Sequence, residues 1–149
     1  MSEFKSLDRC AAYVAARTAL TAVQRVAEGW PDELAEPARS AAADTLHVTV
    51  EAISHGHATA GRRRCLRDAL TSAIRVVASI DAARTLGFDG AELDHAQRTA
   101  GRTVALLGMF LHANTAAIPE ATGAAGATRA LRGPRAPGVP GVSGGPGAL

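Results

Sequence analysis

Small apolar residues recur at helical spacing through most of this chain, and this pattern constrains the fold more than any other feature. Of the 149 residues 34 are alanine, the best helix former, and only 3% are aromatic. We find no alternating runs of β-branched or aromatic residues between turn signals, so no strand is expected. The sequence therefore predicts an all-α protein whose helices lie close together around alanine, leucine and valine.

Four helices are predicted, separated by glycine or proline. Their ranges are Leu7–Glu28, Pro37–His55, Arg62–Leu86, and a fourth that starts after Asp89 or Gly90 and ends near Asn114. We expect Ser6 to cap the first helix, Gly29 to end it, and Pro37 to occupy the first turn of the second. Helices of about 20–25 residues with short loops predict an up-down-up-down antiparallel four-helix bundle.

The second predicted helix has an unusually wide apolar arc. Beside the stripe that faces the core, Leu46, Val50 and Ile53 form a second stripe one position round. An arc of this width indicates either a helix deep in the bundle or one that also contacts a neighbouring subunit.

The chain changes character after Ile118. Residues 1–118 carry 13 basic and 13 acidic side chains, whereas residues 119–149 carry three arginines and one glutamate. Repeated glycine and proline without periodicity predict a disordered tail over 119–149 beside a folded domain over 1–118. We find no signal peptide and no apolar run of the roughly 20 residues that a membrane helix needs, so a cytoplasmic protein is expected.

Four arginines lie close together at the predicted start of the third helix, in "GRRRCLRD". Arg62, Arg63 and Arg64 fall in its first turn, where each exposed cation opposes the helix dipole by about 0.3–1 kcal/mol. Arg67 adds a charge one turn on, and a bound phosphate would relieve the repulsion. We expect a phosphate or nucleic-acid contact here. The alternative is a solvated helix end, with Arg64 or Arg67 paired with Asp68 or a neighbouring acid.

The tail carries Arg129, Arg132 and Arg135. Spaced arginines in a disordered segment can add salt-sensitive phosphate contacts to those of the third helix. The alternative is an inert extension that only aids solubility.

Histidines raise the question of a metal site. His47, Glu51 and His55 share one helix face at positions i, i+4 and i+8, a spacing that can hold a transition metal. Glu92 and His95 form one Glu-x-x-His, but a di-iron bundle needs two such pairs and further inward glutamates. We predict no metal site, and keep a site at His47, Glu51 and His55 as the alternative.

The remaining chemistry-bearing residues predict no enzyme. Cys10 and Cys65 have neither a disulfide framework nor a metal spacing, and we expect two buried free thiols. No nucleophile–base pattern stands out, and no glycine-rich phosphate loop follows a strand. The sequence therefore predicts a binding protein without a cofactor.

Several short motifs follow one another in a defined order. They are Phe4-x-x-Leu7, the corner Trp30-Pro31, the helix "PARSAAADTLHVTVEAISHG" ending in Ile53-Ser54-His55-Gly56, the small residue Ala73, and the closure Leu86-Gly87-Phe88. From Phe4 to about Leu111 this order resembles the 23S rRNA intervening-sequence protein family, which includes the accessory variability determinant proteins of diversity-generating retroelements. His55 stands where that family usually has glutamate.

The resemblance implies a non-enzymatic four-helix bundle that self-associates, in the accessory proteins as a ring of five. It also implies a nucleic-acid-binding partner of a reverse transcriptase. We therefore predict a homo-oligomeric accessory protein that binds RNA or DNA. The alternatives are a protein-interaction or structural bundle without nucleic-acid binding, and a metal-binding helical protein.

Overall fold

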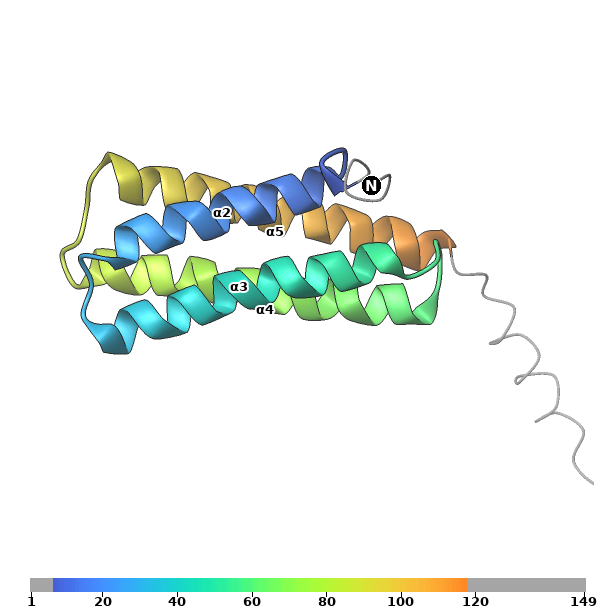
Figure 1. The fold of residues 1–149 in the computed structure, drawn as a ribbon, viewed down its shortest axis with the longest axis horizontal. Helices are drawn as coiled ribbons and strands as arrows, with labels where there is room; N and C mark the ends of the chain where they lie inside the picture. Colours follow the sequence, from blue (N-terminus) through green and yellow to red (C-terminus); the bar gives the residue numbers. More distant parts are fainter. Residues whose placement is uncertain (1–6, 118–149) are drawn as a thin grey trace, which may run out of the picture. The chain divides into compact units, whose positions relative to one another are not determined.

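The computed structural model describes residues 7–117, which form a bundle of four helices (Figure 1). These are α2 (Ala11–Ala27), α3 (Asp32–Ser54), α4 (Ala60–Thr85) and α5 (Ala91–Ala117). Each helix packs against two neighbours, in the cyclic order α2, α3, α4, α5, and consecutive helices run in opposite directions. The predicted all-α four-helix bundle is confirmed. Within residues 7–117 there is no strand, and no helix is long and apolar enough to cross a membrane.

The predicted start of α3 is wrong. The helix begins at Asp32, five residues before Pro37, after Pro31 in an extended conformation. Pro37 lies in the second turn, where it removes one backbone hydrogen bond. Two effects oppose this loss: Asp32 and Glu33 complement the dipole in the first turn, and Ala35 is buried in the core.

The first and third predicted helices also shift at their ends. α2 begins at Ala11 and not at Leu7, because Cys10 is extended, with φ −83° and ψ 111°. α4 begins at Ala60, which places Gly61 inside the helix and moves the arginines two positions further from its start. α5 continues three residues past Asn114, to Ala117.

A glycine follows the end of both α2 and α4, but only the one after α4 adopts a left-handed conformation. Gly87 has φ 93°; its N–H donates to Arg84 O at 3.0 Å, and the Phe88 N–H donates to Ala83 O at 3.1 Å. These two bonds form the Schellman closure of a helix. Gly29 directly follows Glu28, the C-cap of α2, so the helix ends where it was predicted to end, although Gly29 does not adopt a left-handed φ.

The core is built mainly from alanine. Sixteen of the 24 buried hydrophobic residues are alanine, and the largest include Trp30, Ile80, Leu93 and Leu107. Three buried threonine hydroxyls in α3 and α5 donate to the carbonyl one turn earlier, for example Thr45 to Ala41 O at 2.7 Å. Small side chains therefore let all four helices approach closely without leaving these hydroxyls unpaired.

Several predictions fall outside the described residues. These are the Ser6 cap, the Phe4 motif position, the boundary at Ile118, the disorder of residues 119–149, and the tail arginines Arg129, Arg132 and Arg135.

Candidate functional site at the turn between α3 and α4

The turn from α3 to α4 holds an unusual backbone conformation. After Ser54 the chain becomes extended at His55, with φ −74° and ψ 147°. Ala58 then takes φ 58°, the one positive φ on a non-glycine residue within residues 7–117. Thr59 caps α4: its hydroxyl oxygen accepts from Arg62 N–H at 3.1 Å, and its O–H donates to Gly56 O at 2.9 Å. These contacts fix where the first turn of α4 points.

The four arginines predicted as a phosphate site lie together at this end. Arg62 and Arg63 are half-buried, whereas Arg64 and Arg67 are exposed. Among residues 7–117 none of the four has a carboxylate within 4.0 Å, so the pairing of Arg64 or Arg67 with Asp68 that the alternative predicted does not occur. The first turn of α4 also lacks an acidic residue. The positive charge of this helix end is therefore not neutralised by the described part of the chain.

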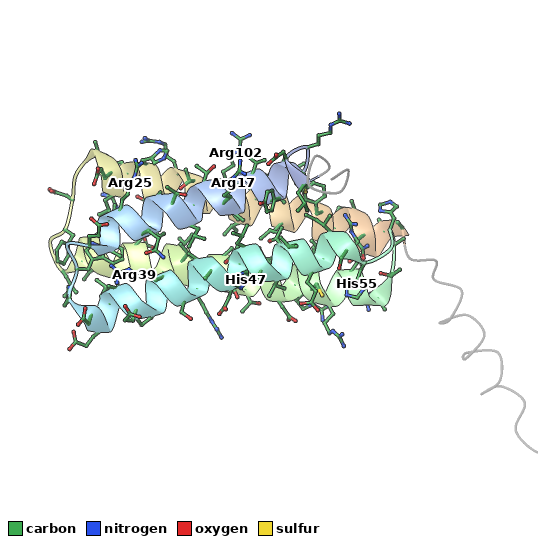
Figure 2. All side chains as sticks on the ribbon, in the orientation of Figure 1. Arg17, Arg25, Arg39, His47, His55 and Arg102 are labelled. Atoms are coloured by element: carbon green, nitrogen blue, oxygen red, sulfur yellow. The ribbon has the colours of Figure 1, made fainter. Side chains whose placement is uncertain are left out.

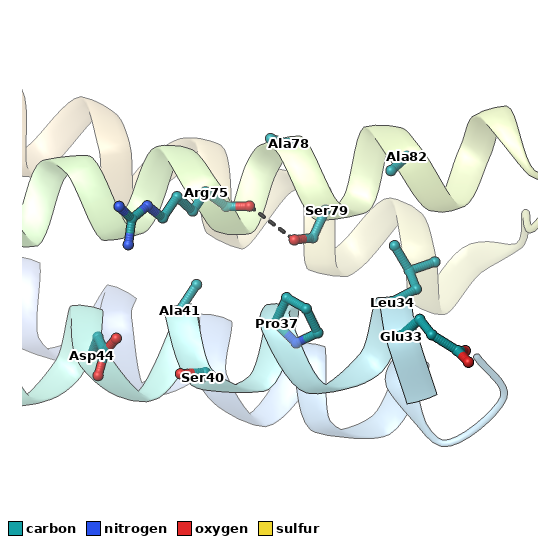
Figure 3. Close-up of a pocket in the computed structure, with 10 residues that line it drawn as sticks. All are labelled: Glu33, Leu34, Pro37, Ser40, Ala41, Asp44, Arg75, Ala78, Ser79 and Ala82. Atoms are coloured by element: carbon teal, nitrogen blue, oxygen red, sulfur yellow. Dashed lines mark hydrogen bonds between the residues drawn. The ribbon is translucent and has the colours of Figure 1, made fainter. Parts of the chain in front are cut away.

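Sequence reasoning missed a fifth arginine on the same side of α4. Arg75 lies two turns after Arg67, is exposed, and has no ion pair among the described residues. It lines a groove of about 520 Å³ between α3 and α4, opposite Asp44 and Ser40 (Figure 3). Arg75 is eleven positions after Arg64, which is about three full helical turns, so these two residues share a helix face, a signal that the sequence already contained.

A basic groove lies between α2 and α5, on the opposite side of the bundle, whereas the groove at Arg75 is also lined by the two carboxylates Glu33 and Asp44. The groove between α2 and α5 encloses about 430 Å³ and is lined by Arg9, His95 and Arg102 among smaller residues. Figure 2 shows Arg25 and Arg102 on these two helices and His47 and His55 on α3. The groove also contains Asp8, which pairs with Arg17 at 3.2 Å, so its positive charge is partly balanced.

The residues that lie together differ from those of the alternative metal site that the sequence suggested. Glu51 and His55 do lie one turn apart on α3, but the third nearby group is Cys65 of α4 and not His47. One potential ligand atom from each residue lies within 4.8 Å of the other two. We call these three residues the Cys65 cluster. The sequence could not reveal it, because the turn brings Cys65 back against α3.

The other candidates stay apart. Glu92 and His95 are exposed on α5, while Leu93 and Ala96 between and beside them are buried, as predicted. Cys65 is buried as expected, whereas Cys10 is only half-buried.

Comparison of the chain with known protein families, with curated proteins and with solved structures finds no match. The structure thus defines a class, an all-α four-helix bundle. The resemblance to the 23S rRNA intervening-sequence family stays a prediction.

Proposed function

We propose that this protein is a non-enzymatic accessory bundle that binds nucleic acid through the arginines at the start of α4. The observation that carries the proposal is that Arg62, Arg63, Arg64 and Arg67 have no acidic partner within residues 7–117. Like charges three or four residues apart destabilise a helix by about 0.2–0.5 kcal/mol per pair. Bound phosphate groups offset this repulsion and form charge-assisted hydrogen bonds with the guanidinium groups.

Arg75 extends the proposed surface along α4. From Arg64 to Arg75 the helix rises about 16 Å at 1.5 Å per residue. Arg64, Arg67 and Arg75 are all exposed, so a polyanion can contact them together. Contacts to the phosphate backbone carry no sequence information, and we expect binding with little base preference.

Self-association would strengthen such a surface. A homo-oligomer presents several copies of a weak site, so their combined affinity exceeds that of one copy. The family resemblance supports a homopentamer with a reverse transcriptase as protein partner, and we include both in the proposal. We place the protein in the cytoplasm, where reducing conditions keep the free thiols of Cys10 and Cys65 reduced.

Binding of a labelled structured RNA and of a matched duplex DNA across a salt series tests the proposal. The full chain is compared with a variant carrying Arg62→Ala, Arg63→Ala, Arg64→Ala and Arg67→Ala. Each lost contact to duplex DNA lowers the slope of log affinity against log salt by about 0.9. Four contacts therefore predict a slope smaller by about 3–4 and a large loss of affinity at low salt.

A charge-matched variant on the other side of the bundle is the control. Substituting Arg9, Arg25, Arg98 and Arg102 by alanine removes the same charge from α2, α5 and the segment just before α2, and should leave most of the salt slope. A third variant, with Arg129, Arg132 and Arg135 changed to alanine, measures the contribution of the tail. Equal losses in the first two variants would indicate binding through net charge alone. An unchanged α4 variant would contradict the proposal.

A second candidate function is protein interaction through α3. Leu46, Val50 and Ile53 are half-exposed and belong to neither buried core cluster, although their sequence positions form a continuous stripe. Val50→Asp should therefore disturb self-association while the bundle stays helical. Sedimentation of the full chain and of this variant tests it. An unchanged oligomeric state would remove α3 as the interface.

A further inference from the structure

The Cys65 cluster combines three different ligand types from two helices. Glu51 and His55 are one turn apart on α3, so both side chains lie on the face toward which Cys65 of α4 points. Cys65 is 3% exposed, His55 is half-buried and Glu51 is exposed. A thiol, an imidazole and a carboxylate therefore meet at the border between the core and solvent.

Gly61 leaves room for the imidazole ring of His55. A Cβ atom at position 61 would lie 2.9 Å from both Cε1 and Nδ1 of His55, so any side chain at position 61 would displace the His55 ring. Glycine inside a helix costs about 1 kcal/mol relative to alanine, and Gly61 is the second residue of α4. The chain thus carries a helix-weakening residue at the one place where the His55 ring needs the space.

We infer that Glu51, His55 and Cys65 bind a single zinc ion at the turn between α3 and α4. Thiolate, imidazole and carboxylate are the zinc ligands of proteins, and three protein ligands leave the fourth tetrahedral position open to water. Magnesium and calcium prefer oxygen ligands only, so this mixed set does not suit them. The three ligands are different residues from the arginines proposed to bind nucleic acid, although Arg64 is next to Cys65 in the chain and its charge reaches the thiol.

The distances suit this assignment after small side-chain rotations. Zinc bonds of about 2.0–2.3 Å in tetrahedral geometry place ligand atoms roughly 3.3–3.6 Å apart. The three atoms lie within 4.8 Å of one another, so closure requires about 1 Å of movement. Glu51 is exposed, so rotation of its side chain can supply most of that movement.

Zinc binding at this site releases the thiol proton of Cys65. Burial, and then the negative charge of Glu51, raise the pKa of the Cys65 thiol above its ordinary value of 9.0. The metal-free thiol is therefore protonated at neutral pH. Zinc binding forms a Zn–S bond, and the thiol proton passes to solvent with no change in oxidation state.

Titration of the full-length, chelator-treated protein with Co²⁺ and then Zn²⁺ tests the inference. We expect one Co²⁺ per chain, with the visible bands of a tetrahedral site and a near-ultraviolet thiolate charge-transfer band. Added Zn²⁺ should abolish both. Cys65→Ser should remove the charge-transfer band, and His55→Ala and Glu51→Gln should each weaken zinc binding by about tenfold or more.

Two substitutions serve as matched controls. Cys10→Ser removes the other thiol, and His47→Ala removes the histidine one turn before Glu51; both should bind zinc as the unaltered protein does. Equal weakening in these controls, or a spectrum without thiolate charge transfer, would overturn the site.

Gly61→Ala keeps all three ligands and raises helix propensity. We expect it to weaken zinc binding because its Cβ displaces the His55 ring, with helicity by circular dichroism retained. Binding as tight as in the unaltered protein would show that His55 is not a ligand in this geometry.

Discussion

The two ends of the bundle differ in whether their side chains find interaction partners within the chain. At the end where α2 turns into α3 and α4 into α5, Trp30 and Phe88 pack with ring centroids 6.4 Å apart. Arg84 there pairs with Asp94 and donates from Nε to Gln97 Oε1 at 2.9 Å. Aromatic burial and internal ion pairs use most of the interaction capacity of this end within the chain itself, although Arg39 Nε, in the half of α3 nearer this end, is buried without a hydrogen-bond partner.

The end at the turn from α3 to α4 leaves polar groups without partners. Asn114 is 2% exposed, yet neither atom of its amide has a hydrogen-bond partner among the described residues. The Cys65 cluster and the arginines of α4 lie at this end too. Buried polar groups are normally paired, so unpaired ones indicate strain or a missing ligand. The comparison assigns structural stability to the first end and leaves unpaired polar groups at the second, where we propose binding.

The largest expected effect tests the end of the bundle at which Trp30 and Phe88 pack together. Trp30→Ala removes a side chain that is 7% exposed and contacts Phe88, and should cost about 3–5 kcal/mol of unfolding free energy. Denaturant unfolding measures this loss. Leu86→Ala at the same end removes a 65% exposed side chain and should change stability by no more than about 0.5 kcal/mol. Similar losses in both variants would contradict the assigned role of Trp30.

The second effect tests the end at the turn from α3 to α4, and here the substitution is expected to raise stability. Asn114→Leu replaces the unpaired buried amide by an apolar group of similar shape, and should raise the unfolding free energy by about 1–3 kcal/mol. Thermal or denaturant unfolding measures the gain. A loss of stability would mean that the amide has a partner at this end.

The third effect concerns the backbone of the turn. Ala58→Gly relieves a left-handed φ of 58°, which costs alanine roughly 1–2 kcal/mol. The greater freedom of glycine in the unfolded chain offsets part of this, leaving a gain of about 0.5–1 kcal/mol. Ala78→Gly in the middle of α4 is the control and should lose about 0.5–1 kcal/mol. Losses in both variants would show that Ala58 is not strained.

The smallest effect appears only in alkaline solution. The unfolded thiol of Cys65 ionises near its ordinary pKa of 9.0, whereas burial and the charge of Glu51 raise the folded pKa. Stability from this group is therefore complete below pH 9.0 and falls as pH rises toward the folded pKa. Unfolding of the metal-free protein at several alkaline pH values should show the decline. Cys65→Ala should remove it and Cys10→Ser should keep it.

Periodicity alone predicted the helices but not all of their ends. The inward positions of α4, such as Leu66, Val76 and Ile80, are buried as their spacing predicts. Proline at position 37 misled the prediction for α3, because the burial of Ala35 and the acidic first turn outweigh its missing hydrogen bond. Local sequence signals predict a helix start correctly only where tertiary packing does not favour a different start.

The grouping of the arginines was visible in the sequence, whereas the Cys65 cluster was not. Consecutive residues such as Arg62, Arg63 and Arg64 are neighbours in any helix, so their grouping was visible in the sequence. That they lack acidic partners depends on which side chains the fold brings near them.

By itself the sequence determined four helices, their alanine-rich inward faces and the basic start of α4, because these follow from spacing within one helix. Tertiary structure decided the capping at Thr59, the strained turn at Ala58 and the meeting of Cys65 with Glu51 and His55. Such a meeting depends on how α4 folds back along α3, and the register between two packed helices is set by side-chain packing that no single helix contains.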